Sequence, residues 1–309
     1  MTDRVGFIGL GIMGRPMALN LQRAGVDLVV HARRVESMRP LSEAGAVTCA
    51  SPAEVARQTD VIFTMVSDTP DVEAVILGAN GLVEGARAGA VVVDMSTISP
   101  LASRVIAKRL AGQGVEMLDA PVSGGEVGAI NGTLSIMVGG SVSAFARVLP
   151  MLEMMGTNIV RIGENGAGQV CKCCNQILVG ATIAGVAEAL LLAKSSGVDP
   201  AKVREALLGG FARSRVLEIH GQRMIDEDFR PGFKVRLHQK DLRIVTENSQ
   251  ALGLALPSTA LVSQYLNTLV EQGLGDLDSA AIYQVLREMN ASGGGHPPAS
   301  DSQIPVSIR

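Results

Sequence analysis

The sequence predicts an α/β protein in which a parallel sheet covered by helices is followed by an all-helical domain. Three observations support this fold class: short β-branched segments alternate with helical segments in the first half, a glycine-rich turn follows the first strand, and residues 164–290 contain helical patterns without a convincing strand. We place the two domains at 1–163 and 164–290. The Gly-, Pro- and Ser-rich segment 291–309 is expected to be a disordered tail.

Seven short segments of the first half have the length and composition of buried strands. Between the first two, residues 13–24 have apolar side chains at helical spacing, and Gly25 follows as a C-cap glycine. Repeated strand–helix–strand units produce parallel sheets with helices on both faces. The expected strands are 4–8, 28–31, 61–65, 91–94, 116–119, 133–139 and 159–162.

The second half begins with a long apolar helix, expected from 166 to about 196. Asp199 has the character of an N-cap residue and Pro200 that of a first-turn residue of the next helix. From there to residue 290 the pattern indicates only helices, separated by Gly, Pro and Asp.

Composition excludes several functional classes. With 47% hydrophobic residues and a net charge of −3, the chain can build large cores but has no concentrated basic face for nucleic acid. The most apolar stretch, 177–193, is interrupted by Thr182 and Glu188, and no secretory signal pattern opens the chain. We therefore expect a soluble, cytoplasmic protein without a nucleic-acid or membrane partner.

The four cysteines do not have the spacing of a zinc site or of an obvious disulfide pair, so no metal is expected. Burial as small apolar side chains is the favoured interpretation. Redox sensing is the alternative, and it requires a thiolate of low pKa, for which proximity to Lys172 is an argument. The cysteines are Cys49, Cys171, Cys173 and Cys174.

A glycine fingerprint, G-x-G-x-x-G, spans residues 9–14 between a predicted strand and a predicted helix. This context is typical of a Rossmann-type dinucleotide-binding domain, in which the glycines permit a tight turn, close approach of a pyrophosphate and close helix packing. The alternative is a glycine-rich turn without a ligand. The candidate cofactor residues here are Gly9, Leu10, Gly11, Ile12, Met13 and Gly14.

The end of the second predicted strand indicates which dinucleotide is bound. NAD sites place an acidic residue there, whereas this chain has His31, Arg33 and Arg34 and no Asp or Glu before Glu36. Guanidinium groups suit a 2′-phosphate, so NADP(H) is favoured and NAD(H) remains possible. The alternative is that the arginines are solvated surface residues.

Two further motifs indicate chemistry. Ser123, Gly124 and Gly125 follow a strand and could form a small anion nest for a carboxylate, or else a plain turn. Lys172 lies in an apolar helical segment, where burial among its neighbours Val170, Cys171, Cys173 and Cys174 would lower its pKa toward the range of a general acid or base. Asn175 and Gln176 are on its helical face and could orient substrate or lysine. A solvent-exposed lysine is the alternative.

Taken together, the segments 6–17, 119–125, 166–176 and 240–242 resemble the β-hydroxyacid dehydrogenase family. They occur in the family's order, and the similarity extends to about residue 290. Within the family, the motifs are most similar to the tartronate semialdehyde (2-hydroxy-3-oxopropionate) reductase branch. One departure concerns the lysine segment: many relatives have asparagine four residues after the lysine, where this chain has Gln176. Which amide meets the substrate is left open.

The resemblance implies roles for individual residues. Lys172 matches the catalytic lysine, and the loop 123–125 matches the site of the substrate carboxylate. Phe233 matches a substrate-pocket aromatic. Lys240 matches a lysine that reaches the nicotinamide region of the cofactor, and Asp241 is the next residue. The segment 180–192 is a plausible interface helix for a homodimer or homotetramer. The family's other cofactor contacts correspond to Met65, Val66 and Thr97.

The function implied is NADPH-dependent reduction of tartronate semialdehyde to D-glycerate, with the lysine as general acid and base. A 3-hydroxyisobutyrate dehydrogenase, or another reductase of small aldehyde acids, is the alternative within the family. A non-catalytic dinucleotide-binding scaffold is a third hypothesis. It predicts loss of the catalytic positions, whereas Ser123, Lys172 and Lys240 are all present.

Overall fold

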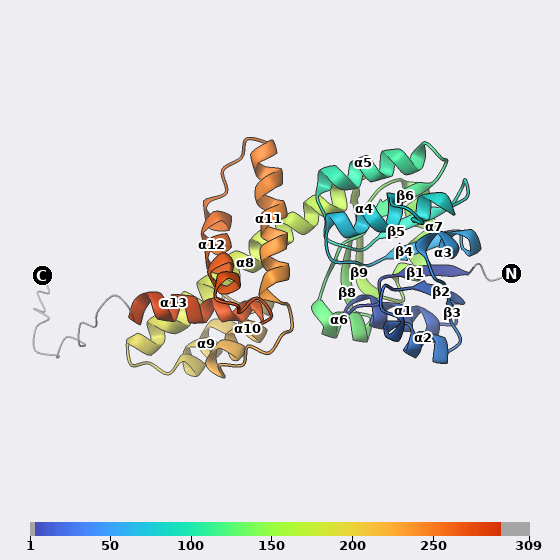
Figure 1. Ribbon diagram of the computed structural model, residues 1–309. Helices are drawn as coiled ribbons and strands as arrows, with labels where there is room; N and C mark the ends of the chain where they lie inside the picture. Colours follow the sequence, from blue (N-terminus) through green and yellow to red (C-terminus); the bar gives the residue numbers. More distant parts are fainter. Residues whose placement is uncertain (1–3, 292–309) are drawn as a thin grey trace, which may run out of the picture. The chain divides into compact units, whose positions relative to one another are not determined.

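A computed structural model describes residues 4–291, which form two compact units (Figure 1). Of the described residues, the sheet unit comprises 4–176 and 240–255, and the helical unit comprises 177–239 and 256–291. The division between the units does not fall at residue 163, where the sequence placed it. Two long helices, α8 (Ala167–Ser195) and α11 (Val235–Ala251), each contribute residues to both units. The predicted tail, apart from residue 291 at the end of the last helix, lies outside the described residues.

The sheet unit is built on one mixed sheet in the order β3-β2-β1-β4-β5-β6-β8-β7, with β9 beside β8. Strands β1 to β6 are parallel, as predicted, but β8 runs antiparallel to β6 and β7. The two-residue strands β3 and β7 are too short to have a periodic pattern, and the sequence analysis missed both. The strands are β1 Val5–Ile8, β2 Leu28–His31, β3 Val47–Thr48, β4 Val61–Thr64, β5 Val91–Asp94, β6 Glu116–Asp119, β7 Val122–Ser123, β8 Leu134–Gly139 and β9 Gly156–Gly163.

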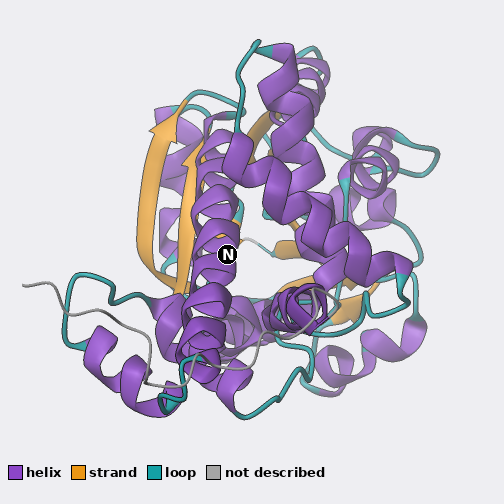
Figure 2. Cartoon of the chain, turned by 90° about the vertical axis from the view of Figure 1, so that its left-hand side faces the viewer, coloured by secondary structure: helices purple, strands orange, loops and turns teal. Residues whose placement is uncertain are grey.

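Figure 2 shows strands of the sheet with helices beside them. The sheet has a hydrophobic core on each face, as the alternation of side chains along a strand requires. Phe7 and Val30 pack in one core, and their neighbours Ile8 and Val29 pack in the other. Helices α1, α2, α6 and α7 contribute to the first core, and α3, α4 and α5 to the second. The helices are α1 Gly14–Arg23, α2 Arg39–Glu43, α3 Pro52–Gln58, α4 Thr69–Leu77, α5 Pro100–Ala111, α6 Gly125–Asn131 and α7 Val142–Leu152.

The helical unit contains no strand among its described residues, apart from one isolated bridge between Lys234 and Asp278. Asp199 caps α9, as predicted, because its carboxylate accepts a hydrogen bond from the N–H of Ala201, with Pro200 in the first turn. Besides parts of α8 and α11, the unit contains α9 Pro200–Leu208, α10 Arg215–Ile225, α12 Pro257–Glu271 and α13 Ile282–Ala291.

Helix α8 is the one helix in the described part of the chain that is long and apolar enough to cross a membrane by length and composition. Its sheet-unit part nevertheless contains three buried polar side chains, Gln169, Lys172 and Gln176. Each of them is hydrogen-bonded to another segment of the same unit. These bonds are typical of the core helix of a globular domain, which passes the same test of length and hydropathy.

Candidate active site

The turn between β1 and α1 has the geometry that the glycine fingerprint predicts. Gly9 has a φ of 95°, and a Cβ built on it would lie 2.2 Å from the carbonyl oxygen of Met65. A Cβ on Gly14 would lie 1.9 Å from the carbonyl oxygen of Gly9. Both contacts are far below van der Waals distance, so the fold itself requires glycine at these two positions.

Gly11 differs, because a Cβ built there would meet no protein atom within 4 Å. The fold therefore gives no reason for a glycine at this position, which is exposed. An open backbone beside the N-terminus of a helix is the arrangement that binds a pyrophosphate, because free N–H groups and the positive end of the helix dipole face the anion. The loop thus fits a dinucleotide. Of its other residues, Leu10 is buried in the core, whereas Ile12 is half exposed.

The residues expected near the adenosine ribose lie at the end of β2 and directly after it. His31 is partly exposed, and its Nδ1 atom is 3.0 Å from the carbonyl oxygen of Cys49. Arg33 is exposed and forms an ion pair of 3.3 Å with Asp71 in the first turn of α4, while Arg34 is exposed. Both guanidinium groups therefore face solvent, where a phosphate could meet them, but that of Arg33 is already paired with Asp71.

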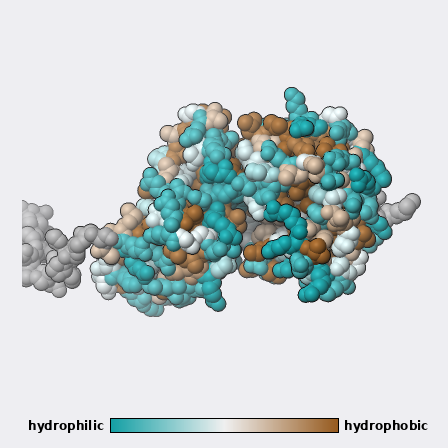
Figure 3. Space-filling view, in the orientation of Figure 1, coloured by the Kyte–Doolittle hydropathy of each residue, from teal (hydrophilic) through white to brown (hydrophobic). Residues whose placement is uncertain are grey.

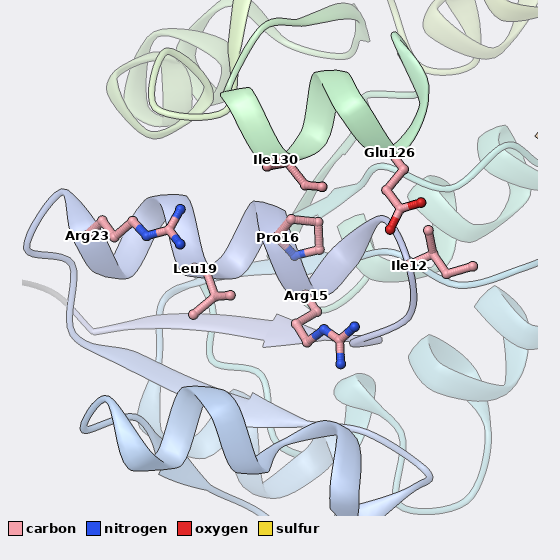
Figure 4. A pocket seen from close by; sticks show the side chains of 7 residues that line it. All are labelled: Ile12, Arg15, Pro16, Leu19, Arg23, Glu126 and Ile130. Carbon is pink, nitrogen blue, oxygen red and sulfur yellow. The ribbon is translucent and has the colours of Figure 1, made fainter. Parts of the chain in front are cut away.

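A pocket of about 210 Å³ separates α1 from α6 (Figure 4). Its lining includes Ile12 from the fingerprint loop and Glu126 from the first turn of α6. The two helices are joined nearby, where the Nδ2 atom of Asn20 donates to the carbonyl oxygen of Ala129 at 2.8 Å. Because α1 begins at the fingerprint loop and α6 begins at Gly125, the predicted cofactor and carboxylate loops are neighbours.

The loop 123–125 is held open by its backbone conformation. Gly124 has a φ of 136° and Gly125 a φ of 63°, both in the range that favours glycine. Ser123 ends β7 and is held in register by pairing with Ser135 of β8. A Cβ on Gly125 would meet no atom within 4 Å, so the space over this backbone is open.

Lys172 is buried, with 7% of its surface exposed. Its Nζ donates a hydrogen bond of 2.8 Å to the carbonyl oxygen of Val122, the residue directly before Ser123. Burial lowers the pKa of Lys172 from its usual value, the negative charge of Asp241 opposes this, and the positive charge of Lys240 adds to it. The ammonium group therefore lies beside the candidate carboxylate loop, and its lowered pKa means that it gives up a proton more readily.

The burial of Lys172 was predicted, but its cause is different from the one proposed. Val170 and Cys174 are exposed, so these sequence neighbours do not cover the lysine. Its neighbour Cys173 is buried, and the hydrogen-bond partner of the lysine, Val122, comes from a distant segment of the chain. Burial also raises the pKa of the Cys173 thiol to about 12 and raises the pKa of Cys171. These shifts contradict the low-pKa thiolate that redox sensing at these two positions requires. The four cysteines are free thiols.

Asp241 connects the lysine segment to α11. Its Oδ2 accepts a hydrogen bond from Gln176 Nε2 at 2.7 Å, and its Oδ1 forms an ion pair with Lys240 Nζ at 2.8 Å. Lys240 also donates to the carbonyl oxygen of Thr97 at 2.6 Å, and Asn175 Nδ2 donates to Gln176 Oε1 at 2.7 Å. Five predicted site residues are thereby brought into one hydrogen-bonded network beside Lys172.

Three buried polar residues behind this network were not predicted as site residues. Asp119 accepts hydrogen bonds from the N–H groups of Gly166 and Gln169, at 2.6 and 2.9 Å, and so fixes the start of α8. The side chain of Gln169 in turn bonds the backbone of Ser96 and Ile98. Asp94 pairs in register with Asp119 on the neighbouring strand, and burial raises the pKa of both carboxyls to about 6. The sequence feature that could have revealed these two carboxyls is that an acidic residue ends each of two adjacent strands, β5 and β6.

The remaining candidates are placed as follows. Met65 and Val66 follow β4 and are partly buried, and the N–H of Val66 donates to Ser96 Oγ at 2.9 Å. Phe233 lies in the helical unit, where its N–H donates to Asp278 and its ring stands 5.4 Å from that of His238. A contact between Phe233 and substrate stays a prediction. Residues 4–291 contain no group of three or more His, Cys, Asp or Glu side chains that could hold a metal ion.

Comparison with known proteins gives matches over most of the described chain. Residues 4–163 match the model of the NAD-binding domain of 6-phosphogluconate dehydrogenase, and residues 166–286 match that of the NAD-binding region of NADP-dependent 3-hydroxyisobutyrate dehydrogenase. The chain is 49% identical over 290 residues to the 2-hydroxy-3-oxopropionate reductase of Escherichia coli K12. The aligned region covers 93% of this chain and 98% of the relative.

Two solved structures extend the comparison. The 3-hydroxyisobutyrate dehydrogenase of Mycobacterium tuberculosis, solved with L-serine, aligns with a TM-score of 0.86 at 29% identity over 93% of this chain and 100% of that chain. Psf3 in complex with NADP+ and 2-OPP aligns with a TM-score of 0.84 at 26% identity over 91% and 99%. The glycine loop and both matched regions therefore establish a nicotinamide dinucleotide-dependent oxidoreductase, and the chain belongs to the 3-hydroxyisobutyrate dehydrogenase-like family of β-hydroxyacid dehydrogenases.

Proposed function

We propose that this enzyme reduces tartronate semialdehyde to D-glycerate with NADPH. The observation that carries the proposal is the 2.8 Å hydrogen bond from Lys172 Nζ to the carbonyl oxygen of Val122, since it holds a buried ammonium group directly beside the loop 123–125. The 49% identity to the E. coli reductase supports this substrate over others of the family.

The residues of the loop would hold the carboxylate of the substrate. The hydroxyl of Ser123 and the N–H groups of Gly124 and Gly125 are hydrogen-bond donors in a turn that has open space over Gly125. Such a nest fixes one end of a three-carbon acid and leaves its aldehyde group to face the lysine. The nicotinamide supplies a hydride to the aldehyde carbon when it is bound.

Lys172 would act as the general acid. As the aldehyde oxygen gains negative charge, the ammonium group donates a proton to it, and a lysine whose pKa is lowered by burial gives up this proton more readily. In the reverse direction the neutral amine accepts the proton from the hydroxyl group. Catalysis of this type contributes about 10²–10⁴-fold to the rate.

NADPH rather than NADH is proposed because arginines, and no acidic residue, follow β2. Arg33 and Arg34 would bind the 2′-phosphate, and His31 would lie beside the same ribose. Met65, Val66 and Thr97 would contact the cofactor from the loops that follow β4 and β5. Lys240 would approach the nicotinamide region from α11.

A substrate panel tests the proposal. Purified enzyme is assayed by the absorbance of the reduced nicotinamide with tartronate semialdehyde, methylmalonate semialdehyde and succinic semialdehyde, each with NADPH and with NADH. We expect the highest kcat/KM with tartronate semialdehyde and NADPH. A higher value with methylmalonate semialdehyde would favour 3-hydroxyisobutyrate dehydrogenase, the function named for the M. tuberculosis structure. Binding of NADPH without turnover of any aldehyde acid would favour a non-catalytic scaffold.

A homodimer or homotetramer is proposed as the assembled form, and the cytoplasm as its location. The view in Figure 3 shows apolar side chains among hydrophilic ones over the surface. Within the helical unit, Leu178 and Leu192 of α8 are 68% and 70% exposed, and Gly185 between them has open space over its backbone. At seven-residue spacing these positions lie along one face of the helix, which suits close packing against a second copy.

A further inference from the structure

We propose that Gln176 and Asp241 form a positioning pair for Lys172, and that Asn175 is the amide that meets the substrate. This inference deepens the proposed function and rests on it. It assigns separate roles to two adjacent amides, whereas the sequence leaves open which of them meets the substrate. It also gives a reason why a glutamine, one methylene longer than asparagine, stands four residues after the lysine.

The polar atoms of Gln176 are occupied by the protein. The side chain is 3% exposed, its Nε2 donates to Asp241 Oδ2 at 2.7 Å, and its Oε1 accepts from Asn175 Nδ2 at 2.7 Å. An amide that is hydrogen-bonded at both ends and enclosed in this way lacks the access that a substrate contact needs.

Asn175 has the opposite character. It is partly exposed, it donates one N–H to Gln176, and its Oδ1 has no hydrogen-bond partner within residues 4–291. Its position three residues after Lys172 places it on the same face of α8. A carbonyl oxygen and one N–H therefore remain for the hydroxyl group of a hydroxy acid, next to the lysine that transfers the proton.

Asp241 is the centre of the positioning pair. The carboxylate is 4% exposed, and each oxygen has its own partner, Gln176 Nε2 on one side and Lys240 Nζ on the other. Its negative charge acts on the ammonium of Lys172 and opposes the effect of burial. Because Gln176 is neutral, it fixes this carboxylate without adding a charge to a site that already contains two lysines and one aspartate.

Three variants separate the two roles. Gln176→Met keeps the length of the side chain and removes both hydrogen bonds, whereas Asn175→Ser is the matched control on the neighbouring amide. For Gln176→Met we expect kcat to fall roughly tenfold or more, with KM for the aldehyde acid changed by less than about threefold. For Asn175→Ser we expect KM to rise roughly tenfold with a smaller change in kcat. Gln176→Asn, which is polar but shorter, serves if the methionine variant does not fold.

The pH profile gives a readout that a merely structural role would not move. Reduction needs the protonated lysine, so activity falls at high pH with the pKa of Lys172. A loosened Asp241 holds the ammonium less well, so Gln176→Met and Asp241→Asn should both move this limb to lower pH. The double variant should be no worse than the more affected single variant, because the pair acts as a unit.

A measurement without substrate distinguishes failure of this inference from failure of the proposed function. In protein labelled with ¹³C-lysine, the Cε resonance of Lys172 is identified by its loss in Lys172→Met and titrated with pH. A lower pKa in Gln176→Met supports the pair even if no aldehyde acid in the panel is reduced. A wild-type titration in Gln176→Met, or a raised KM with unchanged kcat in that same variant, would overturn the inference.

Discussion

The fingerprint loop and the lysine network are constructed in different ways. The loop spans residues 9–14, and its shape is set by the backbone, since a Cβ on Gly9 or Gly14 would collide with a carbonyl oxygen. The network is made of side chains from distant segments, because Lys172 bonds Val122 and Lys240 bonds Thr97. The loop is therefore a local structure and the network a tertiary one.

This difference implies that cofactor binding and proton transfer can be damaged separately. A substitution in the loop changes the surface that the pyrophosphate meets, whereas a substitution in the network changes the charge and orientation around Lys172. The expected effects below test this separation, beginning with the largest.

The largest effect is expected for Gly14→Val. Its Cβ would lie 1.9 Å from the Gly9 carbonyl oxygen, so the turn and α1 must move apart. We expect a loss of stability of about 3 kcal/mol or more and no measurable NADPH binding. Thermal unfolding and fluorescence titration with NADPH measure both quantities.

Gly11→Ala is the matched control in the same loop. Nothing in the protein opposes its Cβ, so stability should be unchanged while NADPH affinity falls. Unchanged NADPH affinity in Gly11→Ala would mean that the pyrophosphate does not lie over this backbone.

The second effect concerns the buried carboxyls beneath the network. The pKa of Asp94 is about 6 in the folded protein against 3.8 for the free side chain, so the native state keeps a proton that the unfolded chain has released. The resulting stabilisation is fully present below about pH 4, is lost as the pH rises toward 6, and is absent above.

Asp94→Asn removes this titration. Between pH 4 and 7 the stability of the wild type should fall by roughly 2–3 kcal/mol more than that of the variant, and urea unfolding at a series of pH values measures the difference. Parallel pH profiles for the two proteins would show that Asp94 does not titrate in this range.

A smaller effect is expected at the adenosine end. Arg33→Ala removes a guanidinium that the proposal places at the 2′-phosphate, so the Kd of NADPH should rise about tenfold while that of NADH changes little. Arg34→Ala tests the neighbouring arginine in the same titration. Equal losses for NADPH and NADH in both variants would show that neither arginine reads the 2′-phosphate.

The smallest effect on catalysis is expected for Leu192→Glu on the exposed face of α8. A charge there should disrupt packing against a second copy, which light scattering after size-exclusion chromatography detects. The sheet unit holds both the loop and the network, so NADPH affinity should stay within about twofold. An unchanged assembly would show that the α8 face is not the interface.

The two regions also differ in how well the sequence predicts them. The strands at 28–31, 91–94 and 116–119 were predicted with their observed ends, and the glycine loop followed from spacing alone, because both depend on local patterns. The burial of Lys172 was predicted as well, but the sequence neighbours that were thought to cause it are partly exposed.

Tertiary contacts explain what was missed. Asp119 and Gln169 fix the start of α8 through partners far away in the chain, and no local pattern reveals such bonds. Likewise, the bond between Gln176 and Asp241 spans two helices, so the separate roles of the two amides could not be assigned from the sequence. Strands of two residues, such as β7, are also below the length at which periodicity is informative.

The central claim is that Lys172 donates the proton during reduction, and Lys172→Met tests it most directly because methionine fills a similar buried volume. We expect kcat with tartronate semialdehyde and NADPH to fall roughly 10²–10⁴-fold, with the Kd of NADPH changed by less than about threefold. A variant that reduces the aldehyde at the wild-type rate would contradict the account.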